Sequence, residues 1–165
     1  MTDPVEIVDY DPSWPAEFER LAERALAALG PLGVRAEHLG STAVPGLAAK
    51  PVIDLALVIR SPDDLPGAVS VLGALGYEHE GDRGIPGLEA FAWPVGERRH
   101  HLYVCAEGAA ELARMRAFRD RLRADPDEAA AYERLKRELA ARHRHDRTAY
   151  TDAKTEFVTR VSSAG

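Results

Sequence analysis

The segment from Val52 to Ile59 constrains the fold most, because it is a continuous β-branched and apolar run that contains a single carboxylate, Asp54. A run of this kind predicts a central strand that is covered on both faces. A carboxylate inside such a strand is costly unless its charge meets a partner or a cation. Asp54 is therefore either a structural acid, paired with Lys50, an arginine or a backbone N–H, or part of a binding site.

A glycine–serine bend favours the binding site. Residues 34–39 predict a strand that runs into Gly40 and Ser41, and Asp54 follows Ser41 by thirteen positions. A bend of this kind offers backbone N–H groups and a hydroxyl to an anion. The candidate phosphate-binding residues around this bend are His38, Gly40, Ser41, Thr42 and, on the following loop, Lys50.

The rest of the chain predicts a mixed sheet with helices packed on it. Alternation of apolar residues and turn residues predicts further strands at residues 77–79, 88–93 and 101–105, with a short strand or edge segment at 5–10. Apolar residues at helical spacing predict helices at 14–29, 63–76, 109–123, 128–143 and 150–161, with Ser13 as the N-cap of the first.

Composition narrows the class of protein. A chain of 165 residues is expected to form one domain, and a net charge of -6 argues against general nucleic-acid binding. The single cysteine, Cys105, excludes an intramolecular disulfide and a multi-cysteine zinc site. No signal-peptide pattern or membrane span is seen, so we expect no membrane partner and a cytoplasmic location. No feature singles out an oligomeric state.

The Gly40-Ser41 pair followed by Asp54 resembles the nucleotidyltransferase superfamily. The longer strings His38–Leu47 and Lys50–Asp54 resemble the GrpB family, whose domain also occurs fused to dephospho-CoA kinases, and this likeness runs from Val5 to Lys154. The resemblance implies an α+β (α/β-like) fold: a nucleotidyltransferase-like mixed sheet flanked by helices over residues 1–105 and a C-terminal helical segment over 106–165.

The resemblance also implies a site built around Asp54. In the superfamily, two alternating strand carboxylates hold metal ions, whereas here the second position is Ala56. We expect Asp54 to carry Mg²⁺, with Glu89 from a later strand as a further ligand and Glu80 and Asp82 as alternatives from a loop. Adjacent strand residues point to opposite faces, so only one of His100 and His101 can join Asp54, and we predict His101 as the catalytic partner.

The C-terminal helices carry further cations. Arg119, Lys136 and Lys154 match the family's helical signature and are predicted to clamp phosphates, the alternative being a solvated helix face with pairs such as Glu133 with Arg137 and Asp120 with Arg123.

Three functional hypotheses remain. The first is metal-dependent nucleotidyl or phosphoryl transfer on a nucleotide or phosphorylated metabolite. The second is a binding module for the same ligands without transfer chemistry, which the alanine at position 56 supports. The third is a helical interaction domain that uses the C-terminal helices as a partner surface.

Overall fold

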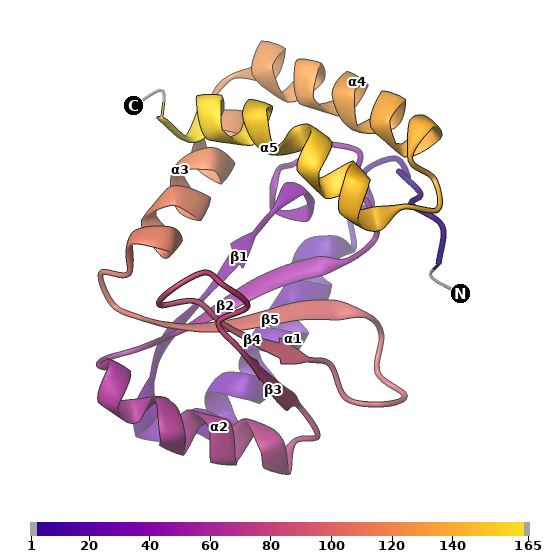
Figure 1. Cartoon of the computed structure of the whole chain (residues 1–165). Coiled ribbons are helices and arrows are strands. Elements are labelled where there is room, and N and C mark those ends of the chain that lie inside the picture. The colour runs from indigo at the N-terminus through magenta and orange to yellow at the C-terminus, as the bar shows by residue number, and fades with distance from the viewer. Residues whose placement is uncertain (1–2, 164–165) are drawn as a thin grey trace.

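A computed structural model describes residues 3–163 and shows a five-stranded mixed sheet with helices on both faces (Figure 1). The strand order is β1-β2-β5-β4-β3, in which β2 and β5 are parallel and the other neighbours are antiparallel. The strands are β1 (Gly33–Leu39), β2 (Ile53–Ile59), β3 (Glu78–Gly81), β4 (Glu89–Ala92) and β5 (His100–Ala106).

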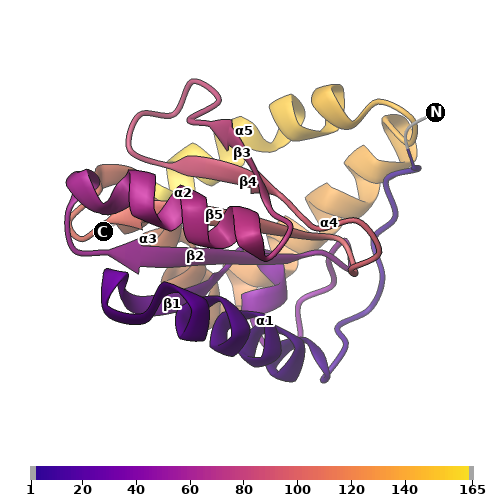
Figure 2. The same ribbon diagram turned by 90° about the horizontal axis from the view of Figure 1, so that it is seen from below.

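Five α-helices surround this sheet. They are α1 (Trp14–Leu29), α2 (Leu65–Ala74), α3 (Ala110–Ala124), α4 (Pro126–Arg142) and α5 (Arg147–Ser163). Helices α1 and α2 pack on one face of the sheet and α3 on the other. Figure 2 shows α1 on the opposite side of the strands from α5, which lies beside α4. The fold class is α+β, as predicted.

Strand β2 is central and covered on both faces, which confirms the prediction from its apolar run. Its residues Ile53, Leu55, Leu57 and Ile59 pack with α1 and α2, because alternate side chains point to the same face. Ala56 and Val58 point the other way, into a cluster that contains Leu39 of β1 and Leu112 of α3. Asp54 belongs to this second set, so it faces the C-terminal helices.

The predicted strands and helices are all present, with ends shifted by a few residues, but two local predictions differ. The segment at residues 5–10 forms only an isolated bridge between Val8 and Ala49 rather than a strand. Ser13 is the N-cap of α1 without a side-chain capping bond. Its backbone N–H instead donates to the Asp11 carboxylate. Among the described residues, no helix has the length and apolar character needed to cross a bilayer.

Candidate functional site

A cavity of about 260 Å³ lies where the bend after β1 meets the start of β2, and we call it the lysine pocket. Gly40, Ser41 and Asp54 line it together, so the structure brings the glycine–serine bend and the strand carboxylate into one space. The remaining walls come from the loop before β2, from β5 and from α3, α4 and α5; they include Thr42, Lys50, His101, Tyr103, Phe118, Tyr132, Lys136, Tyr150 and Lys154.

The bend fits closely against the carboxylate. Gly40 has φ +70°, and a Cβ atom added there would lie 2.3 Å from Asp54 Oδ2. Leu39 is the register partner of Asp54, so the chain must turn directly beside this carboxylate as it leaves β1. Glycine is required by both the backbone conformation and the close approach. The following residues Ser41–Ala43 form a 3-10 turn that sets Ser41 against the pocket.

His101 is the direct partner of Asp54. The two residues are paired in the parallel register of β2 and β5, and His101 Nδ1 lies 2.6 Å from Asp54 Oδ1. Both side chains are about a quarter to a third exposed, at 26% for Asp54 and 34% for His101. With Nδ1 bound to the carboxylate, Nε2 remains for a ligand.

His100 takes the opposite face, as alternation predicts. Its side chain is buried and its Nε2 bonds to the Tyr77 hydroxyl at 2.7 Å. The structure therefore places His101, and not His100, beside Asp54.

The sequence contains three lysines, and all three line this pocket, although the chain carries 21 Lys and Arg residues in total. Lys50 comes from the loop before β2, Lys136 from α4 and Lys154 from α5. Asp54 is the one carboxylate that the described part of the chain contributes to the lining. The pocket therefore holds an excess of positive charge in a protein whose net charge is -6.

Aromatic rings hold these ammonium groups. Lys50 and Lys154 both lie over the ring of Tyr150, with Nζ at 5.2 and 4.7 Å from its centre, and Lys136 lies 4.8 Å from that of Tyr132. A cation over a ring is attracted by the ring quadrupole, but the ring does not neutralise its charge. The lysines are thus ordered while their charge stays available to an anion.

Burial and mutual repulsion shift the lysine pKa values. Burial, helped by the charges of Lys154 and Lys50, lowers the pKa of Lys136 to about 7. Burial and the charge of Lys50 lower the pKa of Lys154 to about 8, although Asp54 acts in the opposite direction. Burial also lowers the pKa of Lys50. An anion bound between them would relieve this strain, because an opposite charge favours the protonated amines.

Lys136 has a second role, which is to hold the loop before β2. It is 2% exposed, and its Nζ donates to the Ala48 carbonyl at 2.5 Å. From the same helix, Glu133 accepts a hydrogen bond from the Ala48 N–H at 2.9 Å. This contact replaces the predicted intrahelical pair of Glu133 with Arg137, since Arg137 binds Asp9 instead.

Two predicted phosphate-binding residues lie outside the pocket. His38 points to the α1 face, because it sits one residue before Leu39 on β1, and its ring stacks on Phe18 at 4.6 Å between centres. Burial lowers the pKa of His38 to about 4, so it is neutral near pH 7. Its Nε2 bonds to Thr42 Oγ1 at 2.9 Å, so it orders the 3-10 turn, and it is not among the residues that line the pocket.

Arg119 also supports the bend from outside. Its guanidinium donates to the His38 carbonyl at 3.1 Å and to the Asp120 carboxylate. Asp120 therefore pairs with Arg119 and not with Arg123, its predicted partner. Arg123 in turn donates to the Ala43 carbonyl at 2.9 Å. Helix α3 thus holds both ends of the bend through backbone oxygens. The prediction that Arg119 binds phosphate is corrected to a positioning role.

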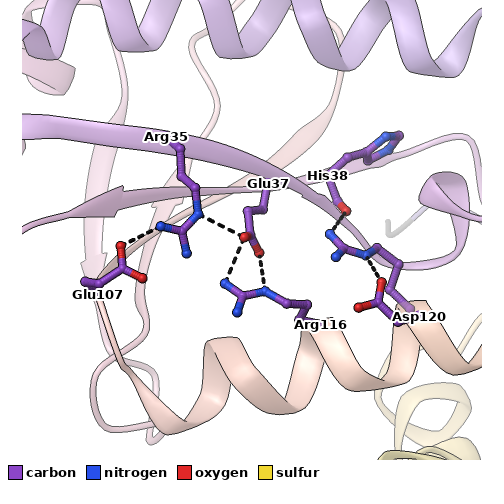
Figure 3. A network of polar contacts seen from close by, with 7 residues as sticks. Arg35, Glu37, His38, Glu107, Arg116 and Asp120 are labelled. Carbon is purple, nitrogen blue, oxygen red and sulfur yellow. Dashed lines mark hydrogen bonds and ion pairs between the residues drawn. The ribbon is translucent and has the colours of Figure 1, made fainter.

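The same helix is fixed to β1 by a network of ion pairs (Figure 3). Arg116 binds both carboxylate oxygens of Glu37 at 2.8 and 3.1 Å, and Arg35 bonds to Glu37 at 3.0 Å while also reaching Glu107. Glu37 is largely buried, with 12% of its side chain exposed. This network sets the position of α3, and through it the position of the bend.

Glu89 is not near Asp54, which corrects its prediction as a metal ligand. It pairs with Val104 in the β4–β5 register and therefore points to the opposite face of the sheet. Its carboxylate binds His79 Nε2 at 2.8 Å. The two alternatives are also engaged, since Glu80 binds Arg83 and Asp82 accepts from the Gly84 N–H.

From the residues that the structure describes, the pocket offers Mg²⁺ a single carboxylate, that of Asp54. Within residues 3–163, no three His, Cys, Asp or Glu side chains gather as a ligand set for a metal ion. Asp54 alone can offer carboxylate oxygen, and one of its oxygens already binds His101. Mg²⁺ is often held by one or two carboxylates together with substrate phosphates. The pocket thus suits an ion that arrives with a phosphate-bearing ligand.

Three tyrosines that line the pocket were not predicted as site residues. They are Tyr103 of β5, Tyr132 of α4 and Tyr150 of α5. The Tyr150 hydroxyl is buried and has no hydrogen-bond partner among the described residues. A signal was present in the sequence, because Tyr132 and Lys136 are spaced like Tyr150 and Lys154, four residues apart and so on one helix face.

The chain is similar to several known proteins over nearly its whole length. The chain is 35% identical to a UPF0157 protein of Bacillus subtilis over 93% of its residues and 39% identical to one of Pseudomonas aeruginosa over 96%. It spans 45% and 66% of the lengths of these two proteins. A dephospho-CoA kinase of Mycolicibacterium paratuberculosis is 32% identical over 92% of this chain, which covers 43% of that protein.

Solved structures show the same fold. The crystal structure of the conserved protein GrpB from Enterococcus faecalis superposes with a TM-score of 0.87 at 30% identity, covering 95% of this chain and 94% of that one. The Cid1 poly(U) polymerase, solved with MgATP, superposes with a TM-score of 0.59 at 13% identity over 83% of this chain and 45% of its own. This second likeness shows a shared nucleotidyltransferase-like fold. The family model described as GrpB protein matches residues 4–164, and the chain belongs to the GrpB family.

Proposed function

We propose that this protein binds a nucleotide or another phosphorylated small molecule in the lysine pocket. The observation that carries the proposal is the convergence of Lys50, Lys136 and Lys154 from three separate elements on one cavity with a single carboxylate. Cations that lie close together and partly buried repel one another and are costly to desolvate. A phosphate group supplies the missing negative charge.

The residues of the pocket have distinct roles in this proposal. Lys50 and Lys154 bind phosphate oxygens directly, because rings rather than carboxylates hold them. The Ser41 hydroxyl and the backbone N–H groups of the Gly40-Ser41 bend add hydrogen bonds. Lys136 contributes its charge and keeps the loop in place through Ala48.

Mg²⁺ would enter with the ligand. Asp54 would hold it together with phosphate oxygens, and the ion would supply further neutralisation of the phosphates when bound. The fold likeness to a polymerase solved with MgATP supports a nucleotide as the ligand class.

Calorimetry tests the proposal. ATP, UTP and pyrophosphate are titrated, with and without Mg²⁺, into wild-type protein and into Lys50→Gln and Lys154→Gln. We expect at least one of these ligands to bind, and each substitution to weaken it about tenfold or more, because a charge-assisted hydrogen bond is lost. Arg134→Gln, an exposed residue of α4 with the same charge change, is the matched control and leaves affinity unchanged. Wild-type protein that binds none of the three, or lysine variants that bind like the control, would refute the proposal.

A second candidate function is transfer of the bound nucleotidyl or phosphoryl group. The specific observation that favours it is the Asp54–His101 pair, in which the carboxylate orients an imidazole whose Nε2 is free to accept a proton. His101 would take the proton of an acceptor hydroxyl as its oxygen attacks phosphorus and pyrophosphate leaves. Release of labelled pyrophosphate by wild type, lost in His101→Gln while calorimetric affinity is retained, is the expected result. Unchanged pyrophosphate release in that variant, or no release by wild type, would refute this second candidate and leave binding as the proposed function.

A further inference from the structure

A second cavity, of about 790 Å³, adjoins the lysine pocket, and we call it the arginine cavity. Lys50, His101 and Tyr103 line both spaces, so the two are neighbours across these side chains. The far side of the arginine cavity is formed by Trp93 after β4, Arg99 before β5 and Arg147 at the start of α5.

Arg99 and Arg147 carry charges that the described residues do not neutralise at close range. The Nε atom of each is buried and has no hydrogen-bond partner among residues 3–163. Among the described residues, the Arg147 side chain donates only to the Asp3 carbonyl, at 3.5 Å through Nη2. Burial lowers the pKa of Arg99, the neighbouring charge of Arg147 adds to this effect, and the charges of Asp3 and Asp54 oppose it.

Within residues 3–163, neither carboxylate that lines this cavity pairs with Arg99 or Arg147. Glu80 is bound to Arg83 at 2.7 Å, and Asp152 of α5 forms no hydrogen bond or ion pair with either arginine in the part of the chain that the structure describes. Buried donors of a guanidinium normally have acceptors, because leaving them unpaired is costly. The planar fork of arginine matches the geometry of carboxylate and phosphate oxygens.

We propose that Arg99 and Arg147 bind an oxyanion group, carboxylate or phosphate, of a second small molecule that lies beside the ligand of the lysine pocket. His101 borders both bound groups, so the second molecule occupies the place of an acceptor next to the Asp54–His101 pair. Trp93 prepares this site, because the Arg99 guanidinium lies 5.6 Å from the centre of its ring, which restricts the arginine before any ligand arrives. The neighbouring ligand is the one of the proposed function, on which this inference rests, whereas Arg99 and Arg147 are not among the residues that line the lysine pocket.

Trp93 is also a reporter of occupancy. The chain has two tryptophans, of which Trp14 is fully buried in the core and Trp93 is 37% exposed at the rim of the arginine cavity. An anion that engages Arg99 changes the surroundings of the Trp93 indole. Indole emission is therefore measured while inorganic phosphate or acetate is titrated in at constant ionic strength, with chloride as the reference salt.

We expect a saturable change in emission with phosphate or with acetate that chloride does not produce and that is lost in Trp93→Phe. The anion that saturates at the lower concentration identifies the oxyanion class. Arg99→Gln and Arg147→Gln shift the midpoint about tenfold or more to higher concentration. Arg98→Gln, the exposed neighbour with the same charge change, titrates like wild type. Absence of saturation with both anions, or titration of the Arg99 and Arg147 variants like wild type, overturns the proposal.

The two sites can be separated. In Lys154→Gln the emission titration is expected to remain while calorimetric binding of the nucleotide weakens, and in Arg147→Gln the reverse is expected. Loss of the emission response in Lys154→Gln would show that the anion reports the lysine pocket instead, and the arginine proposal would then fail while the phosphate site stands.

Discussion

Replacement of Lys136 by methionine should remove a pH-dependent cost to folding. The side chain is 2% exposed, and its ammonium lies in a pocket with two other lysines. Burial and those neighbours lower its pKa from 10.5 to about 7. Methionine fills a similar volume without a charge, so the variant loses the titration and keeps most of the packing.

The sign and size follow from proton linkage. Between pH 7 and 10.5 the unfolded chain binds more protons at this amine than the folded protein does, so the stability of wild type rises with pH in this window. For one group with these pKa values, the gain from pH 7 to pH 9 is about 2 kcal/mol. The lost hydrogen bond to Ala48 adds an offset that depends little on pH, because a neutral amine also donates.

Denaturant unfolding of both proteins at pH 7 and pH 9, in buffers free of phosphate, measures this gain. The free energy of unfolding of Lys136→Met relative to wild type should fall by about 2 kcal/mol between the two pH values. Arg134→Met on the exposed face of the same helix is the control and should show a constant difference. A constant difference for Lys136→Met as well would refute the argument that this lysine is buried with a depressed pKa.

Three further predictions concern the bend, the α3 network and ligand affinity. Gly40→Ala should lose about 1–3 kcal/mol or more of stability in thermal unfolding, since its Cβ would collide with Asp54. Gly46→Ala, with φ +83° but no atom within 4 Å, measures the backbone strain alone, and equal losses would contradict the collision. Arg116→Gln should cost about 1–2 kcal/mol of stability at pH 7. The loss should shrink in acid below the usual titration range of a glutamate, because the pKa of its partner Glu37 is lowered and the carboxylate loses its charge only there. A pH-independent loss would contradict this. Calorimetric affinity for a phosphate ligand should fall about tenfold or more from pH 7 to pH 9 as Lys154 and its neighbours lose their protons, and a flat profile would argue against binding by these amines.

Much of the fold could be predicted from local pattern. The run from Val52 to Ile59 indicated a doubly covered strand because its apolar side chains do not alternate with polar ones. Alternation also selected His101 over His100, since only one of two adjacent strand residues can share a face with Asp54. The bend at Gly40 required glycine for a reason that only the structure shows, which is its contact with the carboxylate.

The site predictions that were wrong concern residues whose positions depend on strand register or on long-range packing. Glu89 was assigned to the site, but the face of a strand residue depends on the register of its pairing, which the length of the connecting turn did not fix. Arg119 was predicted to bind phosphate from its match to the family's helical signature. Its actual position relative to the bend depends on how α3 docks on β1 through Arg116 and Glu37, which local pattern does not show. The convergence of the lysines likewise depends on the packing of α4 and α5, although their scarcity among arginines could have drawn attention to them.

The most direct test of the lysine pocket uses the fact that the chain has no other lysines. An amine-directed reagent is applied near neutral pH, with and without saturating ATP, UTP or pyrophosphate, and modification of Lys50, Lys136 and Lys154 is followed by peptide mass spectrometry. We expect Lys154 and Lys50 to react readily, because their pKa values are lowered, and at least one of the phosphate ligands to protect both. Modification rates that none of these ligands changes would contradict it.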